Sequence, residues 1–304
     1  MNNSAKIIIN KMNIIVLGAG AIGSLYGAKL SKLNDVTLVA RQKHINKINN
    51  DGLKIVGIEE NVYKLKATAK IENIENNTLI LLTTKVHDNK KAIDPIKDLI
   101  KKDTIILCMQ NGLYSENIVK SIVGDRCLVL RGITNVGATF LEPGKVQFSN
   151  LSSTKIENSN ISEELAENFD KCGLKCSVSE NIKQDIWKKL ILNCVLNPVS
   201  AILRVENGKI ADERLNTLKK SIVDECLKVA EKDDVRFDID FVKIINDAIK
   251  DSRNLSSMHQ DVLKGKKTEI DYLNGAVVEL GKKYGIKCPV NEALVVIVKG
   301  MGKQ

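Results

Sequence analysis

Three polar side chains recur at a helical spacing inside an apolar stretch of the chain. Lys189, Asn193 and Asn197 are four residues apart, so a helix places them on one face within about 80° of arc. The residues between them are mostly leucine, isoleucine and valine, which predicts a largely buried helix. Burying an unpaired amide costs about 2–7 kcal/mol. These groups therefore either satisfy one another and the backbone or line a wet cleft.

In a cleft, Lys189 would be suited to give a proton to an oxygen anion, because burial lowers the pKa of a lysine. Lys188 is the competing candidate, but its side chain points about 100° away from the two asparagines. Pro198 follows the row, and we expect it to kink or end the helix and to free a carbonyl group nearby.

A second polar cluster lies further along the chain. Asn254, Ser257 and Asp261 would share one face of a helix, and Glu269 follows Ser257 by twelve residues. In one straight helix Ser257 and Glu269 would be about 18 Å apart, too far to hold one small substrate. We expect Gly265 and its polar neighbours to break the helix, and such a bend would allow Ser257 and Glu269 to share a pocket.

A glycine-rich turn separates the apolar run Met12–Leu17 from a predicted helix over Ala21–Leu33. In a dinucleotide-binding fold the first glycine permits a tight turn, the second lets the backbone approach a pyrophosphate, and the third allows close helix packing. The N-terminus of the helix then offers free N–H groups to phosphate. The candidate cofactor-binding residues of this turn are Gly18, Ala19, Gly20, Ala21, Ile22 and Gly23.

The end of the second predicted strand, Val36–Ala40, distinguishes NAD from NADP in such folds. A carboxylate there would accept from a ribose 2′-hydroxyl, but this chain has Arg41. A guanidinium suits a 2′-phosphate, and nearby Lys43 could add charge. The alternative is an exposed basic residue without a ligand, but its position relative to the glycines favours NADP(H).

Two further polar motifs follow predicted strands. Thr83-Thr84-Lys85 comes after Leu79–Leu82, and Gln110-Asn111-Gly112 comes after Ile105–Met109. The carboxyl edge of a parallel sheet is where ligands bind, so Lys85 and Asn111 are candidates for the nicotinamide side of a cofactor site. Ordinary turn chemistry is an equally good explanation of these residues, especially for Asn-Gly.

Alternating strands and helices over the first part of the chain predict a doubly wound parallel sheet of the Rossmann type. Residues 145–180 could complete the sheet with a strand, a helix at Glu163–Cys172 and another short strand. From about Ile182 onward, long amphipathic segments predict helices alone. We therefore expect a dinucleotide-binding domain over residues 12–180 and an all-helical domain over residues 181–304, with residues 1–11 as a short extension.

Composition limits the remaining possibilities. The 304 residues carry a formal charge of +9, but the lysines are mixed with acids and aromatic residues are scarce, so a solvated surface is favoured over nucleic-acid binding. Seven scattered cysteines predict reduced thiols in a cytoplasmic protein, without a metal site. We expect neither a membrane span nor a cleavable signal. Monomer and homodimer are left undecided.

Taken together, these motifs resemble the ketopantoate reductase (2-dehydropantoate 2-reductase) family over nearly the whole chain from Met12. The matching segments are GAGAIG at 18–23, Arg41, TTK at 83–85, QNG at 110–112, WKKLILNCVLNP at 187–198, SSMHQDV at 256–262 and TEIDYLNG at 268–275. The family fold is a Rossmann domain followed by a helical domain. The resemblance implies that NADPH reduces the C2 carbonyl of ketopantoate, a small 2-keto acid, to give pantoate for pantothenate and coenzyme A synthesis.

By position, the resemblance places the catalytic acid at Lys189 and a catalytic, substrate-binding glutamate at Glu269, the partner of the terminal hydroxyl. It assigns substrate binding also to Asn193, Asn197 and Ser257, and less securely to Asn207. It assigns the cofactor to Lys85, Asn111 and Asn254, besides the glycine turn and Arg41. The alternatives are a relative that reduces another 2-keto acid and a non-catalytic NADPH-binding regulator, which would need neither Lys189 nor Glu269.

Overall fold

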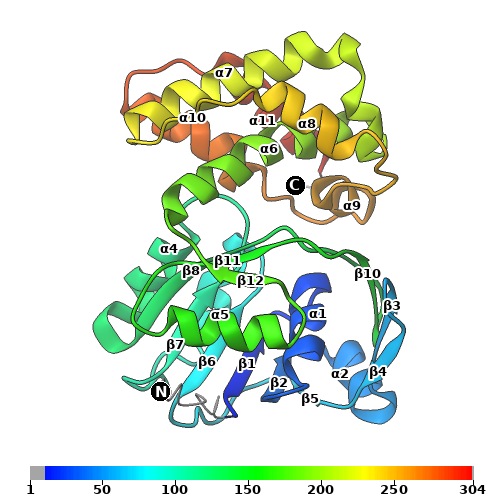
Figure 1. Ribbon diagram of the computed structural model, residues 1–304, viewed down its shortest axis with the longest axis vertical. Coiled ribbons are helices and arrows are strands. Elements are labelled where there is room, and N and C mark those ends of the chain that lie inside the picture. The colour runs from blue at the N-terminus through cyan, green and yellow to red at the C-terminus, as the bar shows by residue number, and fades with distance from the viewer. Residues whose placement is uncertain (1–10, 303–304) are drawn as a thin grey trace, which may run out of the picture. The chain divides into compact units, whose positions relative to one another are not determined.

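A computed structural model describes residues 11–302 (Figure 1). The short extension predicted for residues 1–11 lies outside the described residues, apart from Lys11. Contacts between residues divide the chain into two compact units. The first ends at Ile182 and the second begins at Lys183, but the short segment Asn111–Tyr114 belongs to the second unit.

The first unit is built on an eight-stranded sheet with the order β12-β11-β8-β7-β6-β1-β2-β5. Neighbouring strands are parallel except for β11 and β8, which are antiparallel. The strands are β1 (Asn13–Leu17), β2 (Asp35–Val39), β5 (Lys66–Thr68), β6 (Thr78–Leu82), β7 (Ile105–Cys108), β8 (Leu128–Thr134), β11 (Thr154–Ile156) and β12 (Cys176–Val178). This confirms the predicted Rossmann-type sheet.

Strand β1 lies at the point where the strand order reverses. Leu17, its last residue, is in register with Val39 of β2 on one side and with Leu82 of β6 on the other. The loops that leave these three strands therefore start next to one another at one edge of the sheet. In open α/β sheets this switch point is where ligands bind.

A second, four-stranded sheet in the same unit was not predicted. Its order is β4-β3-β10-β9, with β3 (Leu53–Gly57), β4 (Asn61–Tyr63), β9 (Gly137–Glu142) and β10 (Lys145–Asn150). Its strands β3 and β10 are parallel and pair across about ninety residues of sequence, so no local pattern announces them. The hairpin of β9 and β10 turns at Pro143 and Gly144.

Helix α1 (Ala21–Leu30) contacts both sheets, β1 and β2 of the large sheet and β3, β9 and β10 of the small one (Figure 1). Every residue from Gly23 to Leu30 is buried as a result. A helix covered on both sides has no polar stripe, which explains why its sequence lacks an amphipathic period. The other helices of this unit are α2 (Gln42–Asp51), α3 (Asn89–Ile93), α4 (Ser115–Val123) and α5 (Ser162–Lys171).

The described residues of the second unit form helices and turns without a strand, as predicted. The helices are α6 (Ile182–Leu203), α7 (Asn216–Lys232), α8 (Phe241–Ile249), α9 (Ser257–Leu263), α10 (Asn274–Lys283) and α11 (Pro289–Met301), with 3₁₀ turns η3 (Asn207–Ala211), η4 (Glu213–Leu215) and η5 (Ile270–Tyr272). By length and composition α6 could cross a membrane, but 56% of its apolar window is buried inside the protein. It is the core helix of this unit, with Trp187, Leu190 and Ile191 buried.

Helix α6 runs through Pro198 to Leu203, so Pro198 does not end the helix, whereas the expected free carbonyl is present at Cys194. Proline removes the N–H that would bond the carbonyl of Cys194. That carbonyl accepts instead from Nδ2 of Asn274 in α10, at 2.9 Å. A side chain 80 residues away therefore replaces the missing donor and lets the helix continue.

Candidate active site

The glycine turn occupies the switch point, after β1 and before α1. Gly18 has φ +97°, and a Cβ there would lie 2.6 Å from the backbone nitrogen of Thr84. A Cβ on Gly23 would lie 2.5 Å from the carbonyl oxygen of Gly18 and would also meet the hydroxyl of Thr83. Packing of the protein itself therefore requires glycine at both of these positions.

Gly20 is different, because nothing in the described chain requires a glycine there. Its φ of −79° and ψ of −152° are extended. The nearest atom to a Cβ on Gly20 would be the Gly18 oxygen, at 3.9 Å. Gly20 is exposed and forms the N-cap of α1 without a side-chain hydrogen bond. The open backbone and the start of the helix are what an approaching pyrophosphate needs.

Arg41 follows the end of β2 as the N-cap of α2 and is exposed. Within residues 11–302 it makes no ion pair, so its guanidinium is available to an anion.

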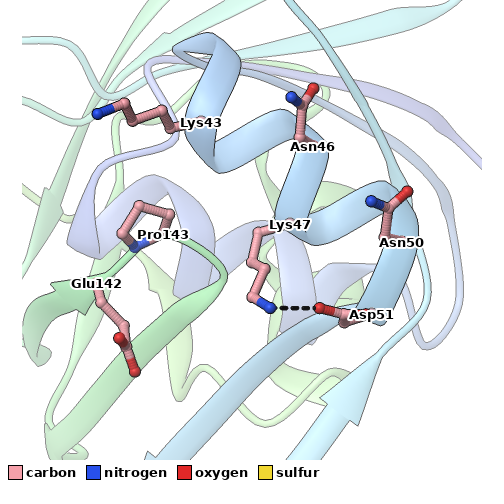
Figure 2. A pocket seen from close by; sticks show the side chains of 7 residues that line it. All are labelled: Lys43, Asn46, Lys47, Asn50, Asp51, Glu142 and Pro143. Carbon is pink, nitrogen blue, oxygen red and sulfur yellow. Dashed lines mark ion pairs between the residues drawn. The ribbon is translucent and has the colours of Figure 1, made fainter.

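Lys43 lines a separate hollow of about 430 Å³ along α2 (Figure 2). Apart from Lys43, none of the residues predicted for the cofactor or substrate site lines this hollow. One of its two lysines, Lys47, is paired with Asp51 at 2.7 Å, and Glu142 adds a second carboxylate, so its lining carries no net charge. Its lining residues are Lys43, Asn46, Lys47, Asn50, Asp51, Glu142 and Pro143.

The segment after β6 is tied to the glycine turn. The Thr83 hydroxyl donates to the carbonyl of Gly18 at 2.9 Å, and the Thr83 N–H donates to the Leu17 carbonyl at 2.9 Å. Lys85 follows two residues later, half-buried, as the N-cap of a 3₁₀ turn at Val86–Asp88. This places Lys85 on the loop next to the glycines.

Sequence reasoning missed Arg131, a buried cation at 3% exposure in β8. Its Nη2 donates to the backbone carbonyl of Gln110 at 2.7 Å, and its Nη1 contacts the Ser115 hydroxyl and lies 3.3 Å from Glu116. Arg131 thus binds Gln110 and Ser115, the two residues that flank the segment Asn111–Tyr114. Arginine in an otherwise apolar strand was the available signal.

Asn111 itself lies on that segment, which packs with the helical unit. Gly112 has φ +81°, and a Cβ there would run into the carbonyl of Tyr272. The Leu113 N–H donates to the same carbonyl at 3.3 Å, and the Leu113 side chain belongs to the core of the helical unit. Within the helical unit, the carbonyl of Tyr272 therefore holds the Gly112–Leu113 part of this segment.

The predicted polar row lies on helix α6. Lys189 and Asn193 are half-buried, and Asn197 is buried at 5% exposure. The Nδ2 atom of Asn193 is buried and has no hydrogen-bond partner among the described residues. Since a buried amide without a partner is costly, this group favours a ligand over internal pairing.

Asn207 begins the turn η3, and its Oδ1 is likewise buried without a partner among residues 11–302. Its N–H donates to the carbonyl of Asn254 at 2.9 Å. A buried lysine that sequence reasoning did not single out, Lys219, donates to the carbonyls of Ile210 at 2.8 Å and Asp212 at 3.2 Å. Its burial lowers its pKa. Lys219 therefore fixes the end of the turn that Asn207 starts.

Asn254 is exposed and lies in the loop before α9, so it does not share a helical face with Ser257 and Asp261 as expected. Ser256 caps α9 by accepting from the His259 N–H at 3.1 Å, and it receives the Ser200 hydroxyl at 2.7 Å. Ser257, exposed, is the first residue of α9. The serine cap thus sets where the helix starts and leaves Asn254 outside it.

The predicted break before Glu269 is present. Helix α9 ends at Leu263, and Gly265 has φ +59°. Glu269 is buried at 6% exposure, and its carbonyl accepts from the Tyr272 N–H at 2.9 Å. A carboxylate at this burial requires polar partners.

The seven cysteines are free, and burial raises the pKa of the Cys108 thiol to about 12. Within residues 11–302 no group of three or more His, Cys, Asp or Glu side chains is arranged to hold a metal ion.

Comparison with known proteins places this site in a family. Residues 14–160 match the family described as ketopantoate reductase PanE/ApbA, and residues 181–302 match its C-terminal counterpart. The chain belongs to the ketopantoate reductase family. As a member it is an oxidoreductase that acts on a CH–OH group.

Individual relatives agree over nearly the full length of this ketopantoate reductase family member. It is 38% identical to the 2-dehydropantoate 2-reductase of Pyrococcus horikoshii, with 95% of this chain and 97% of that protein covered. The crystal structure of a PanE/ApbA family ketopantoate reductase from Ralstonia eutropha has a TM-score of 0.88 at 29% identity, with coverage of 95% and 98%. D-mandelate dehydrogenase with NADH and anilino(oxo)acetate has a TM-score of 0.86 at 29% identity, with the same coverage.

Proposed function

We propose that this protein reduces ketopantoate to pantoate with NADPH. The observation that carries the proposal is the buried, unpartnered amide of Asn193 on the face of α6 that also bears Lys189. Relatives named 2-dehydropantoate 2-reductase that align over 95% of the chain supply the substrate.

The residues of the glycine turn fit a dinucleotide, because Gly20 leaves an open backbone that the protein itself does not require. Gly18–Gly23 would hold the pyrophosphate and Arg41 the 2′-phosphate, with Lys85, Asn111 and Asn254 as the remaining cofactor ligands. NADPH, when bound, supplies a hydride to the C2 carbonyl carbon of the substrate.

The residues of the helical unit carry out the other half of the reaction. Lys189 donates a proton from Nζ to the C2 oxygen as that oxygen gains charge. Asn193, Asn197, Asn207 and Ser257 orient the keto acid. Glu269 accepts a hydrogen bond from the terminal hydroxyl of ketopantoate. A 2-keto acid without that hydroxyl would not form this hydrogen bond, which gives selectivity for the hydroxylated substrate.

A second candidate, reduction of a different 2-keto acid, is favoured by the likeness to D-mandelate dehydrogenase, which binds NADH. Arg41 and Glu269 support NADPH and ketopantoate over this alternative, since an arginine suits a 2′-phosphate and a carboxylate suits a hydroxylated substrate. The free thiols support a cytoplasmic location.

The test follows NADPH oxidation by the purified protein with ketopantoate, pyruvate and benzoylformate. We expect kcat/KM for ketopantoate to exceed the other values by about 100-fold or more, since the site recognises the hydroxyl. Glu269→Gln, a substitution of nearly the same size, should reduce this preference. Faster turnover of benzoylformate would instead assign the protein to the second candidate, and faster oxidation of NADH than of NADPH would overturn the cofactor assignment.

A further inference from the structure

His44 is a buried histidine of α2, at 4% exposure, one turn after Arg41. Its backbone N–H donates to the Arg41 carbonyl at 2.9 Å. Its ring packs edge-on against Phe140 of β9, with centroids 4.9 Å apart. The mechanism proposed above makes no use of this side chain, although it stands between the two parts of the cofactor site.

The two ring nitrogens of His44 have different partners. Nδ1 accepts the backbone N–H of Gly144 at 2.8 Å. Nε2 lies 3.1 Å from the hydroxyl of Ser24 in α1, and that hydroxyl donates to the carbonyl of Ala19 at 3.2 Å. Ala19 is the second residue of the glycine turn.

These bonds determine the protonation state of the ring. The backbone N–H of Gly144 can only donate, so Nδ1 carries no proton and the proton of a neutral ring is on Nε2. Nε2 then donates to Ser24, whose own hydrogen is directed to Ala19. The three hydrogen bonds, with Gly144, Ser24 and Ala19, form together only when His44 is neutral. A proton on Nδ1 would face the Gly144 N–H, and that bond would be lost.

We propose that neutral His44 is a positioning residue for the cofactor, which links the glycine turn through Ser24 to the start of α2 and so sets where Arg41 stands relative to the pyrophosphate loop. The proposal rests on the cofactor assignment above. His44 touches no ligand in this role. It acts through the Ala19 carbonyl on one side and through the first turn of α2 on the other.

The proposal predicts an acid-dependent loss of cofactor affinity. Burial lowers the pKa of His44 below its ordinary value of 6.5. Affinity is therefore full above that value and falls as the pH drops through the lowered pKa, when the ring gains its second proton. The charged side chains on the surrounding elements are exposed or paired, and none of them contributes to the lowering of the His44 pKa. They are Arg41, Lys43, Lys47 and Asp51 on α2, Glu142 before the Gly144 turn, and Lys29 on α1, paired with Glu59.

The experiment measures the Kd of NADP⁺, which is stable in acid, by calorimetry from about pH 5 to about pH 8. The variants are Ser24→Ala, which removes the link to Ala19, and His44→Phe, which keeps the packing against Phe140. Tyr26→Phe is the matched control, because it removes a buried hydroxyl of α1 that bonds Thr134 and Thr154 instead.

At the upper end of this range both variants should raise Kd about tenfold, the effect of one hydrogen bond, while Tyr26→Phe leaves Kd unchanged. The ratio for His44→Phe should fall as the pH drops toward the lowered pKa of His44, because the wild-type ring then loses its bond from the Gly144 N–H. Forming this ratio cancels the titration of the 2′-phosphate, which is common to all proteins compared.

A ratio of one at high pH would overturn the proposal. If His44→Phe does not fold, Ser24→Ala decides by itself. If the wild type binds NAD⁺ and not NADP⁺, the cofactor assignment fails, and the same ratio measured with NAD⁺ still tests the role of His44 at the glycine turn.

Discussion

Substitution of Gly20 by alanine should separate cofactor binding from folding. A methyl group at this position would have the Gly18 oxygen as its nearest neighbour, at 3.9 Å, so it meets no steric obstacle. The backbone is extended, which suits alanine. Gly18→Ala is the matched contrast, because its φ of +97° and the Thr84 nitrogen 2.6 Å from its Cβ forbid a side chain.

Two small terms act on the stability of Gly20→Ala. Alanine is a poorer N-cap residue than glycine, which costs about 0.5–1 kcal/mol. The unfolded chain loses conformational freedom, which stabilises the protein by about 0.4–1 kcal/mol. The two nearly cancel, so the free energy of unfolding should change by less than about 1 kcal/mol. Gly18→Ala should lose about 1–2 kcal/mol from its left-handed backbone, before any cost of the contact with Thr84.

The effect of Gly20→Ala on the cofactor is expected to be larger. The added methyl group stands where the pyrophosphate must approach the N–H groups at the start of α1, and a hydrogen bond to a charged group is worth about 1.5–3 kcal/mol. Loss of one such bond corresponds to a rise in Kd of about 10- to 100-fold.

Urea denaturation and calorimetric titration with NADP⁺ measure the two quantities separately. If Gly20→Ala binds NADP⁺ as tightly as the wild type does, the reasoning is refuted, since no phosphate then lies against this residue. A loss of several kcal/mol in stability would refute the steric argument.

Three further predictions concern other parts of the site. Lys189→Ala should reduce kcat by at least about 100-fold while NADPH still binds, and Lys188→Ala should not; equal turnover in the two variants would remove Lys189 from the acid role. Arg41→Ala should weaken NADPH binding about tenfold more than NADH binding in calorimetry, and equal effects would exclude a 2′-phosphate contact. Gly112→Ala should lower the melting temperature, because φ is +81° and its Cβ collides with the carbonyl of Tyr272; an unchanged melting temperature would show that this loop is not held there.

Several features of this protein could be predicted from local sequence alone. The strand, glycine turn and helix around Gly18–Gly23 follow from short-range pattern, because the conformation of each glycine depends on its immediate neighbours. The helix that carries Lys189, Asn193 and Asn197 follows from a period of four residues. Gly265 likewise indicates a break, since its effect on a helix is local.

Only the tertiary structure shows which residues distant in sequence pair in a sheet or form hydrogen bonds with one another. The small sheet depends on pairing of β3 with β10, and helix α6 continues past Pro198 because Asn274 satisfies the Cys194 carbonyl. His44 meets Gly144 across 100 residues, and Arg131 reaches Gln110 across 21. A donor and an acceptor that are distant in sequence form a hydrogen bond only where the folded chain brings them together. Sequence periodicity therefore places the groups that do chemistry on their helix or strand, whereas packing decides which side chains hold them there.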